Sequence, residues 1–216
     1  MDFNDRVDQG IEFLRTNPAC REILRWALVR CSSERVELSA FEKEVASRDE
    51  YGKGCPEPFF IAQWLVDAGC LDAFDIDAEG NVVNAEAMAA QGATDDEIDD
   101  AIASYAYRTN EVGRAVAEAF APNVRLSKLI AEHPEARPIL RETLSFLCAQ
   151  HTLGELSAHL KTSLAPEEAA AYGALADSTV LASKLSDAGV IEFSSHNWRI
   201  TAEGRELLFE IEHDKR

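Results

Sequence analysis

The stretch LSDAGVIEFSSHNWRITAEGRELL, residues 185–208, has a partial copy earlier in the same chain. Residues 65–72 read LVDAGCLD, which repeats the order Leu-x-Asp-Ala-Gly, two apolar residues and an acid, 120 positions before LSDAGVIE. Two further pairs keep the same order along the chain: PACREILR (18–25) with PEARPILR (134–141), and ELSA (37–40) with ELSA (155–158). Matches that keep their order while the offset changes by only a few residues predict a duplicated unit.

The length and charge of the chain agree with two domains. A chain of 216 residues with 46% hydrophobic residues can build two cores of about 100 residues each. We expect the domains to cover residues 1–121 and 122–216. The formal net charge is −18, and residues 1–121 carry −14 of it, with 11 basic and 25 acidic residues. This charge repels a polyanion such as DNA at long range, although screening over about 8 Å at physiological salt would still allow a local basic patch to act.

Apolar spacing and capping residues predict mostly helix in the second copy. Helical periodicity covers residues 123–132 and 135–149. Thr152 with Glu155 is a capping box, which predicts a short helix through ELSAHLK. A connector with Pro166 follows.

The quoted stretch supplies the rest of the second copy. Asp177 or Ser178 begins another helix, and Gly189 marks its end. VIEF and WRI then predict two short strands of a hairpin, and Thr201 caps a closing helix. The last three of these helices, the two-stranded hairpin and the closing helix, with Gly before the first strand and Thr-x-x-Gly after the second, resemble the winged-helix family. The resemblance implies a fold that is α+β, mostly α, with two winged-helix domains in tandem.

The first copy follows the same plan with an insertion. Its expected helices and first strand are residues 11–15, 19–31, 38–47, PEPFFIAQWLVDAG (56–69) and CLDAFDI (70–76). YRTNEVGRAV (107–116) is the best match to WRITAEGRELL (198–208), so we expect residues 84–103 to be a helical insertion between the strands, with a helix capped by Thr94. AEG at 78–80 lies between extended residues and predicts a hairpin turn.

The sequence holds no recognisable catalytic, cofactor or metal motif. G-x-S-x-G, H-E-x-x-H, the P-loop and paired C-x-x-C are all missing from it. Cys55 lies two positions after Lys53, but an ordinary loop cysteine is the favoured interpretation. We therefore expect no enzyme, no cofactor and no metal site.

Cysteine usage and hydropathy predict a cytoplasmic protein. The five cysteines are odd in number and lack paired spacing, which favours free thiols. No apolar run approaches the roughly 18 residues that a membrane helix needs, and the first residues do not resemble a signal peptide. We therefore expect no membrane partner.

The winged-helix resemblance implies that the helix before the hairpin can enter the major groove of DNA. In the second copy, burial of Leu181, Leu185 and Ala188 turns a polar face outward. The candidate nucleic-acid-binding residues are Thr179, Ser183 and Lys184 on this helix, His196, Asn197 and Arg199 on the hairpin, and Arg205 on the closing helix.

The equivalent helix of the first copy has a surface that is suited to binding protein. The same projection turns Phe59, Gln63, Val66 and Asp67 outward, with Phe60 beside them. An apolar face cannot form the hydrogen bonds that recognise polar base edges. The candidate protein-interface residues are Phe59, Phe60, Gln63 and Val66, covered by the other domain or by a partner. Both copies also have a connector of about a dozen residues before this helix, where a DNA-reading helix-turn-helix uses about three or four.

Two functions follow as expectations. One is a DNA-associated transcriptional regulator that acts through the second domain. The alternative is an acidic protein–protein interaction scaffold or adaptor that does not bind DNA. A homodimer is a further candidate assembly, because many winged-helix regulators act as dimers.

Overall fold

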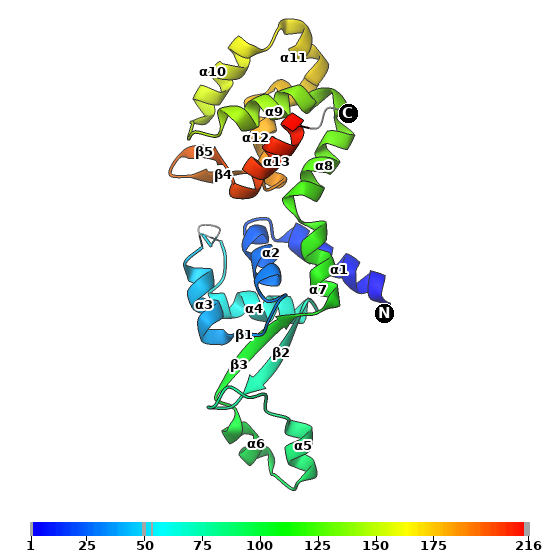
Figure 1. The fold of residues 1–216 in the computed structure, drawn as a ribbon, viewed down its shortest axis with the longest axis vertical. Helices are drawn as coiled ribbons and strands as arrows, with labels where there is room; N and C mark the ends of the chain where they lie inside the picture. The colour runs from blue at the N-terminus through cyan, green and yellow to red at the C-terminus, as the bar shows by residue number, and fades with distance from the viewer. Residues whose placement is uncertain (1, 49–50, 53, 214–216) are drawn as a thin grey trace. The chain divides into compact units, whose positions relative to one another are not determined.

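The computed structural model describes residues 2–48, 51–52 and 54–213, with side chains as far as Glu210. The chain divides into two compact units, Met1–Phe120 and Ala121–Arg216, so the division falls one residue before the expected boundary. The fold is α+β and mostly helical, with small antiparallel sheets, as the sequence predicts (Figure 1). Among the described residues, no helix combines the length and the apolar character needed to cross a bilayer.

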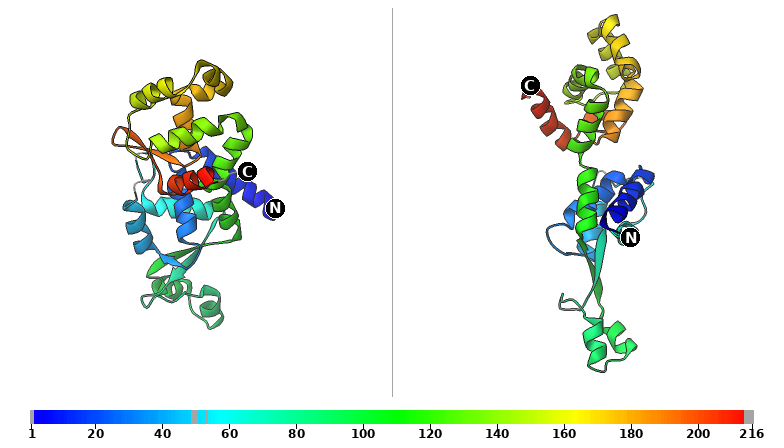
Figure 2. Two further views of the ribbon diagram at one scale, coloured as in Figure 1. Left: turned by 45° about the horizontal axis from the view of Figure 1, so that its top comes forward. Right: turned by 90° about the vertical axis from the view of Figure 1, so that its right-hand side faces the viewer.

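Unit 1 places an insertion of two helices between its longest strands. Its elements are α1 (Phe3–Thr16), α2 (Arg21–Arg30), β1 (Val36–Glu37), α3 (Leu38–Ala46), α4 (Pro58–Asp67), β2 (Leu71–Ile76), α5 (Ala85–Ala90), α6 (Asp95–Ala101), β3 (Ser104–Thr109) and α7 (Glu111–Ala119). α5 and α6 lie beyond the end of β2 and β3, as two further views also show (Figure 2). They fall inside residues 84–103, the expected insertion.

The sheet of unit 1 is antiparallel, with the order β1-β3-β2. β2 and β3 pair along their whole length, from Leu71 opposite Thr109 to Ile76 opposite Ser104. β1 is an addition that apolar periodicity did not predict, because two residues are too few to show alternation. The AEG stretch at 78–80 does form a turn, with Gly80 at φ +86°.

Unit 2 is a series of helices followed by a two-stranded sheet and a closing helix. Its elements are α8 (Pro122–Glu132), η1 (Pro134–Ala136), α9 (Arg137–Phe146), α10 (Leu153–Ser163), α11 (Pro166–Tyr172), η2 (Gly173–Ala176), α12 (Ser178–Asp187), β4 (Ile191–Ser194), β5 (Asn197–Ile200) and α13 (Ala202–His213). The Thr152–Glu155 capping box is present, and Asp177 caps α12. The connector at 163–176 holds α11 and η2, so it is more ordered than a loop.

Each unit has a core of its own. In unit 1, Leu28, Phe41 and Ile61 are fully buried, and Phe41 lies against Tyr107 with 5.8 Å between the ring centroids. In unit 2, the fully buried side chains include Leu140, Leu144, Leu156, Leu181 and Leu185. Each such side chain stabilises its unit by roughly 1.5–3 kcal/mol, so either core can hold its helices together.

The repeated Leu-x-Asp-Ala-Gly sequence forms the same helix ending in both units. Gly69 after α4 and Gly189 after α12 have φ of +70° and +75°, a region that glycine enters without steric cost. The residue after each glycine then donates a backbone hydrogen bond to the leucine of the motif: Cys70 N to Leu65 O at 2.8 Å, and Val190 N to Leu185 O at 3.1 Å. This Schellman turn satisfies a helix carbonyl and directs the chain into β2 or β4.

The closing helices are also anchored alike. Asn110 before α7 accepts a hydrogen bond from Gly113 N at 3.0 Å and donates to Gly69 O at 3.1 Å. Thr201 before α13 accepts from Gly204 N at 3.0 Å and donates to Gly189 O at 3.0 Å. Two different capping side chains therefore make the same pair of contacts, at the positions where 107–116 was expected to match 198–208.

Candidate nucleic-acid and protein interfaces

Helix α12 exposes the polar residues that the sequence assigned to DNA. Asp177 accepts hydrogen bonds from Thr179 N at 2.9 Å and Val180 N at 3.1 Å, which begins the helix, and Leu181 and Leu185 turn inward. Thr179, Ser183 and Lys184 are exposed, as expected. A hydroxyl-rich face with one lysine can donate hydrogen bonds, but it supplies little positive charge.

The β4–β5 hairpin turns through Ser195 and His196, both at positive φ, +51° and +67°. This is the backbone of a type I′ turn, which normally uses Asn or Gly. Asn197 Nδ2 donates to Ser195 O at 3.1 Å, so this amide stabilises the turn. The exposed His196 is thus held at the tip of the hairpin. Asn197 is half-buried, and its side-chain amide already donates a hydrogen bond to Ser195.

Both candidate arginines make contacts inside unit 2. Arg199 Nε lies 2.6 Å from Glu192 Oε1 on the facing strand, because the two residues are directly opposite in the sheet register. Arg205 Nη2 donates to Cys148 O at 3.1 Å. Residues 177–206 carry five acids and three basic residues, so this region of the sequence is acidic in sum.

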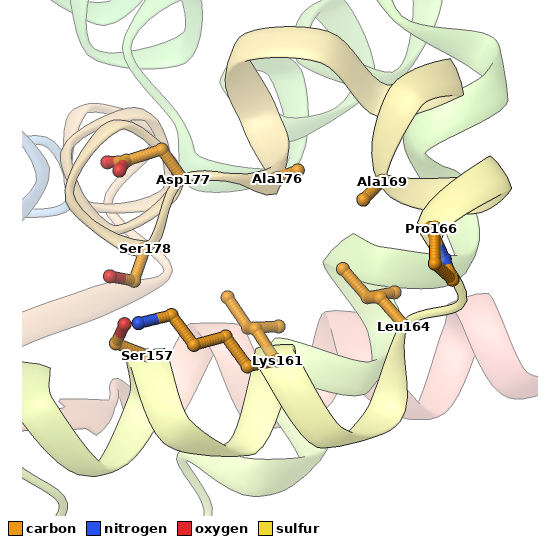
Figure 3. A pocket seen from close by; sticks show the side chains of 9 residues that line it. Ser157, Lys161, Leu164, Pro166, Ala169, Ala176, Asp177 and Ser178 are labelled. Carbon is orange, nitrogen blue, oxygen red and sulfur yellow. The ribbon is translucent and has the colours of Figure 1, made fainter.

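A pocket of about 310 Å³ lies between α10, α11 and the beginning of α12 (Figure 3). Its lining consists of Ser157, Leu160, Lys161, Leu164, Pro166, Ala169, Ala176, Asp177 and Ser178, none of which is a candidate residue from the sequence. Backbone hydrogen bonds from Val180 and Thr179, and more weakly the charge of Lys161, lower the pKa of the Asp177 carboxyl. The positive charge of Lys161 and the negative charge of Asp177 offset each other, so the pocket does not favour a phosphate.

In unit 1, α4 exposes Phe60 more than the projection predicted. Phe60 is 48% exposed, and its ring meets that of Phe59 edge to face, with centroids 5.4 Å apart. Gln63 is half-buried and donates to Asp67 Oδ1 at 2.8 Å. Val66 was expected to face outward, but it is half-buried and packs against the core. The reason is the rotation of α4, which buries Ile61, Ala62 and Leu65 and so places the exposed side closer to Phe60.

A long acidic stretch of unit 1 matches no sequence motif, so the motifs did not predict it. Residues 54–107 contain twelve acids and no lysine or arginine, and they include all of β2, α5 and α6. Within residues 84–103, all of which the structure describes, Ile98 is the one buried side chain. A count of charge in a sliding window would have found this stretch.

Two histidines for which we expected no functional role stack on one phenylalanine. The Phe146 ring lies between His151 and His159, with centroid distances of 3.9 and 4.1 Å. His159 Nε2 also lies 2.9 Å from Glu142 Oε1, and His151 Nδ1 lies 3.6 Å from Glu155 Oε2. These contacts join α9 to α10 and give both rings a structural role.

Among the described residues, no group of three or more His, Cys, Asp or Glu side chains could hold a metal ion. Lys53, the neighbour considered for Cys55, lies outside the described residues. Comparison of the chain with models of protein families, with curated proteins and with solved structures finds no match.

Proposed function

We propose that the chain is a non-enzymatic adaptor that binds other proteins, built from two winged-helix-like units that arose by duplication. The observation that carries this proposal concerns the two arginines expected on the face where a winged helix meets DNA. Each of them already bonds to a group of its own unit. Arg199 pairs with Glu192 at 2.6 Å, and Arg205 donates to a carbonyl of its own unit. Glu192 offsets the charge of Arg199, and the carbonyl occupies one N–H donor of Arg205, so each guanidinium has less charge or fewer N–H groups to offer a phosphate. Non-specific affinity for DNA depends on contacts with phosphates.

Charge and exposure in unit 1 support a protein partner. Residues 54–107 contain twelve acids and no lysine or arginine, and this excess of negative charge repels a polyanion. On α4, the exposed Phe60 and its neighbour Phe59 offer an aromatic surface, and aromatic residues are enriched at protein interfaces. The proposed docking face is therefore the Phe59/Phe60 side of α4.

DNA association through unit 2 is the second candidate. It is favoured by the exposure of Thr179, Ser183 and Lys184 on α12. The connector with α11 and η2 weighs against it, because DNA-reading helix-turn-helix units use a short turn.

A titration with duplex DNA separates the two candidates. The full chain is mixed with a fluorescent random duplex at 50 and 200 mM salt, and polarisation is measured. The adaptor predicts no saturable binding at 50 mM salt up to about 10 μM protein. A DNA regulator predicts binding that weakens with salt, and Lys184→Ala would then lower the slope of log affinity against log salt by about one.

Site-specific crosslinking tests the docking face directly. A photoreactive phenylalanine is introduced at Phe60 and, as a matched control, at Tyr105, which is 42% exposed on β3. The proposal predicts one recurring protein partner, or a second copy of the chain, crosslinked from position 60 and not from position 105. Equal crosslinking from both positions, or no adduct from position 60, would overturn it.

A further inference from the structure

Two thiols in unit 1 each contact the residue that precedes the other. Cys20, at the beginning of α2, is 3% exposed, and its Sγ donates to Gly54 O at 3.3 Å. Cys55, in the segment before α4, is half-buried, and its Sγ donates to Ala19 O at 3.6 Å. The two hydrogen bonds therefore join the same two segments, residues 19–20 and residues 54–55. Positions 20 and 55 are far apart in the sequence, so the fold alone brings them together.

The two segments are in van der Waals contact at this point. Gly54 has φ +104°, and a Cβ at this position would lie 3.4 Å from the Cβ of Ala19. A disulfide needs its two Cα atoms within about 7 Å, which only such a close approach of two segments provides. We propose that Cys20 and Cys55 are a modification site, at which a hydroperoxide converts the two thiols into a reversible intramolecular disulfide.

The reaction begins at Cys55, the more accessible of the two thiols. Its sulfur attacks one oxygen of the peroxide, the O–O bond breaks, and with hydrogen peroxide the products are a sulfenic acid and one water. The Cys20 sulfur then attacks the sulfenic sulfur, so that the S–S bond forms and the S–O bond breaks. The departing oxygen leaves as a second water with the proton of Cys20. The two thiols lose two electrons in total, and the peroxide gains them.

The environment of each cysteine sets this order. Burial, together with the hydrogen bond and charge of Cys55, raises the pKa of Cys20 to about 12, so Cys20 reacts second, once its neighbour is oxidised. Burial also raises the pKa of Cys31 to about 12 and that of Cys70 to about 11. Cys148 is exposed, but it lies in unit 2, where its Sγ donates to Leu144 O one turn earlier. Cys20 and Cys55 are thus the pair whose contacts join two separate segments.

The test uses the full reduced chain and hydrogen peroxide. After oxidation the remaining thiols are alkylated, and the chain is cut with trypsin, which releases Cys20 in residues 16–21 and Cys55 in residues 54–108. We expect these two peptides joined, two hydrogens lighter than their sum, with fragment ions that assign the bond to Cys55 rather than Cys70. Two thiols should be lost per chain, dithiothreitol should restore them, and the unfolding midpoint of unit 1 should rise by roughly 5–10 °C.

Variants keep the test independent of folding defects. Cys55→Ser should abolish the joined peptide, whereas the matched control Cys148→Ser should retain it. If Cys55→Ser does not fold, the peptides of the unmodified chain still decide the matter. Oxidation of Cys55 to the sulfinic acid, or a disulfide between two chains without the 16–21 to 54–108 link, would overturn the proposal.

Discussion

The backbone of Gly204 lies directly against the carbonyl oxygen of Val190. A Cβ at Gly204 would be 2.2 Å from that oxygen, and one at Gly113 in unit 1 would be 2.1 Å from the carbonyl oxygen of Cys70. Both glycines lie in the first turn of the closing helix, and both carbonyls accept a hydrogen bond from the capping residue, Thr201 or Asn110. In each unit, the closing helix can come this close to the residue before β2 or β4 only because the helix carries glycine there.

Gly204→Ala should therefore destabilise unit 2. The new methyl group would have to displace backbone, and overpacking of this kind costs about 1–3 kcal/mol. Urea unfolding of the purified chain measures the change. Gly154→Ala on α10 is the matched control: its Cβ would meet only Thr152 Oγ1, at 3.9 Å, so stability should be unchanged or slightly higher. Equal stability of the two variants would contradict the proposed contact.

The hairpin turn should be improved by residues that tolerate positive φ. Replacing Ser195 by Asn and His196 by Gly matches a type I′ turn, and we expect the double variant to gain about 1 kcal/mol in urea unfolding. Ser183→Gly, on the exposed helical face of α12, should instead lose about 1 kcal/mol. A loss in both variants would show that the turn is not strained.

Substitution by valine should have opposite effects on stability at two buried threonines. Thr143 is fully buried, and its hydroxyl has no hydrogen-bond partner in the part of the chain that the structure describes. Thr143→Val should therefore be neutral or stabilising by about 1 kcal/mol. Thr109 Oγ1 donates to Leu28 O at 2.6 Å, so Thr109→Val leaves that carbonyl unpaired and should cost about 1–3 kcal/mol. Thermal unfolding of the two variants compares them, and a loss at Thr143 equal to that at Thr109 would contradict the assignment.

Acid should weaken the beginning of α12 through Asp177. Backbone hydrogen bonds hold the pKa of this carboxyl below its ordinary value of 3.8. The carboxylate therefore stabilises the fold at pH values above about 4, and this contribution is lost as the pH falls through the lowered pKa. Asp177→Asn keeps a capping oxygen without the titration, so the variant should lose less stability than the unmodified chain between pH 5 and 2.5. Asp8→Asn, which caps no helix, is the control, and its pH profile of urea midpoints should follow that of the unmodified chain.

Local signals in the sequence were sufficient for most of the elements. The Leu-x-Asp-Ala-Gly repeat predicted two helix endings because a Schellman turn needs glycine within one short segment. The Thr152–Glu155 box and the Asp177 cap were predictable for the same reason: donor and acceptor lie within four residues. The exposed side of α12 also followed from the spacing of its leucines. On α4, where apolar residues occur on every side, the same projection placed Val66 on the wrong face.

The sequence by itself thus determined the helix order, the hairpin, the repeated turns and the acidic charge, since each depends on neighbouring residues or on composition. Tertiary structure alone decided which distant groups meet. It paired Arg199 with Glu192, stacked two histidines on Phe146 and brought the segment of Cys20 beside that of Cys55. Such contacts depend on strand register, helix rotation and loop path, and errors of one residue or a fraction of a turn in these move a side chain to another face.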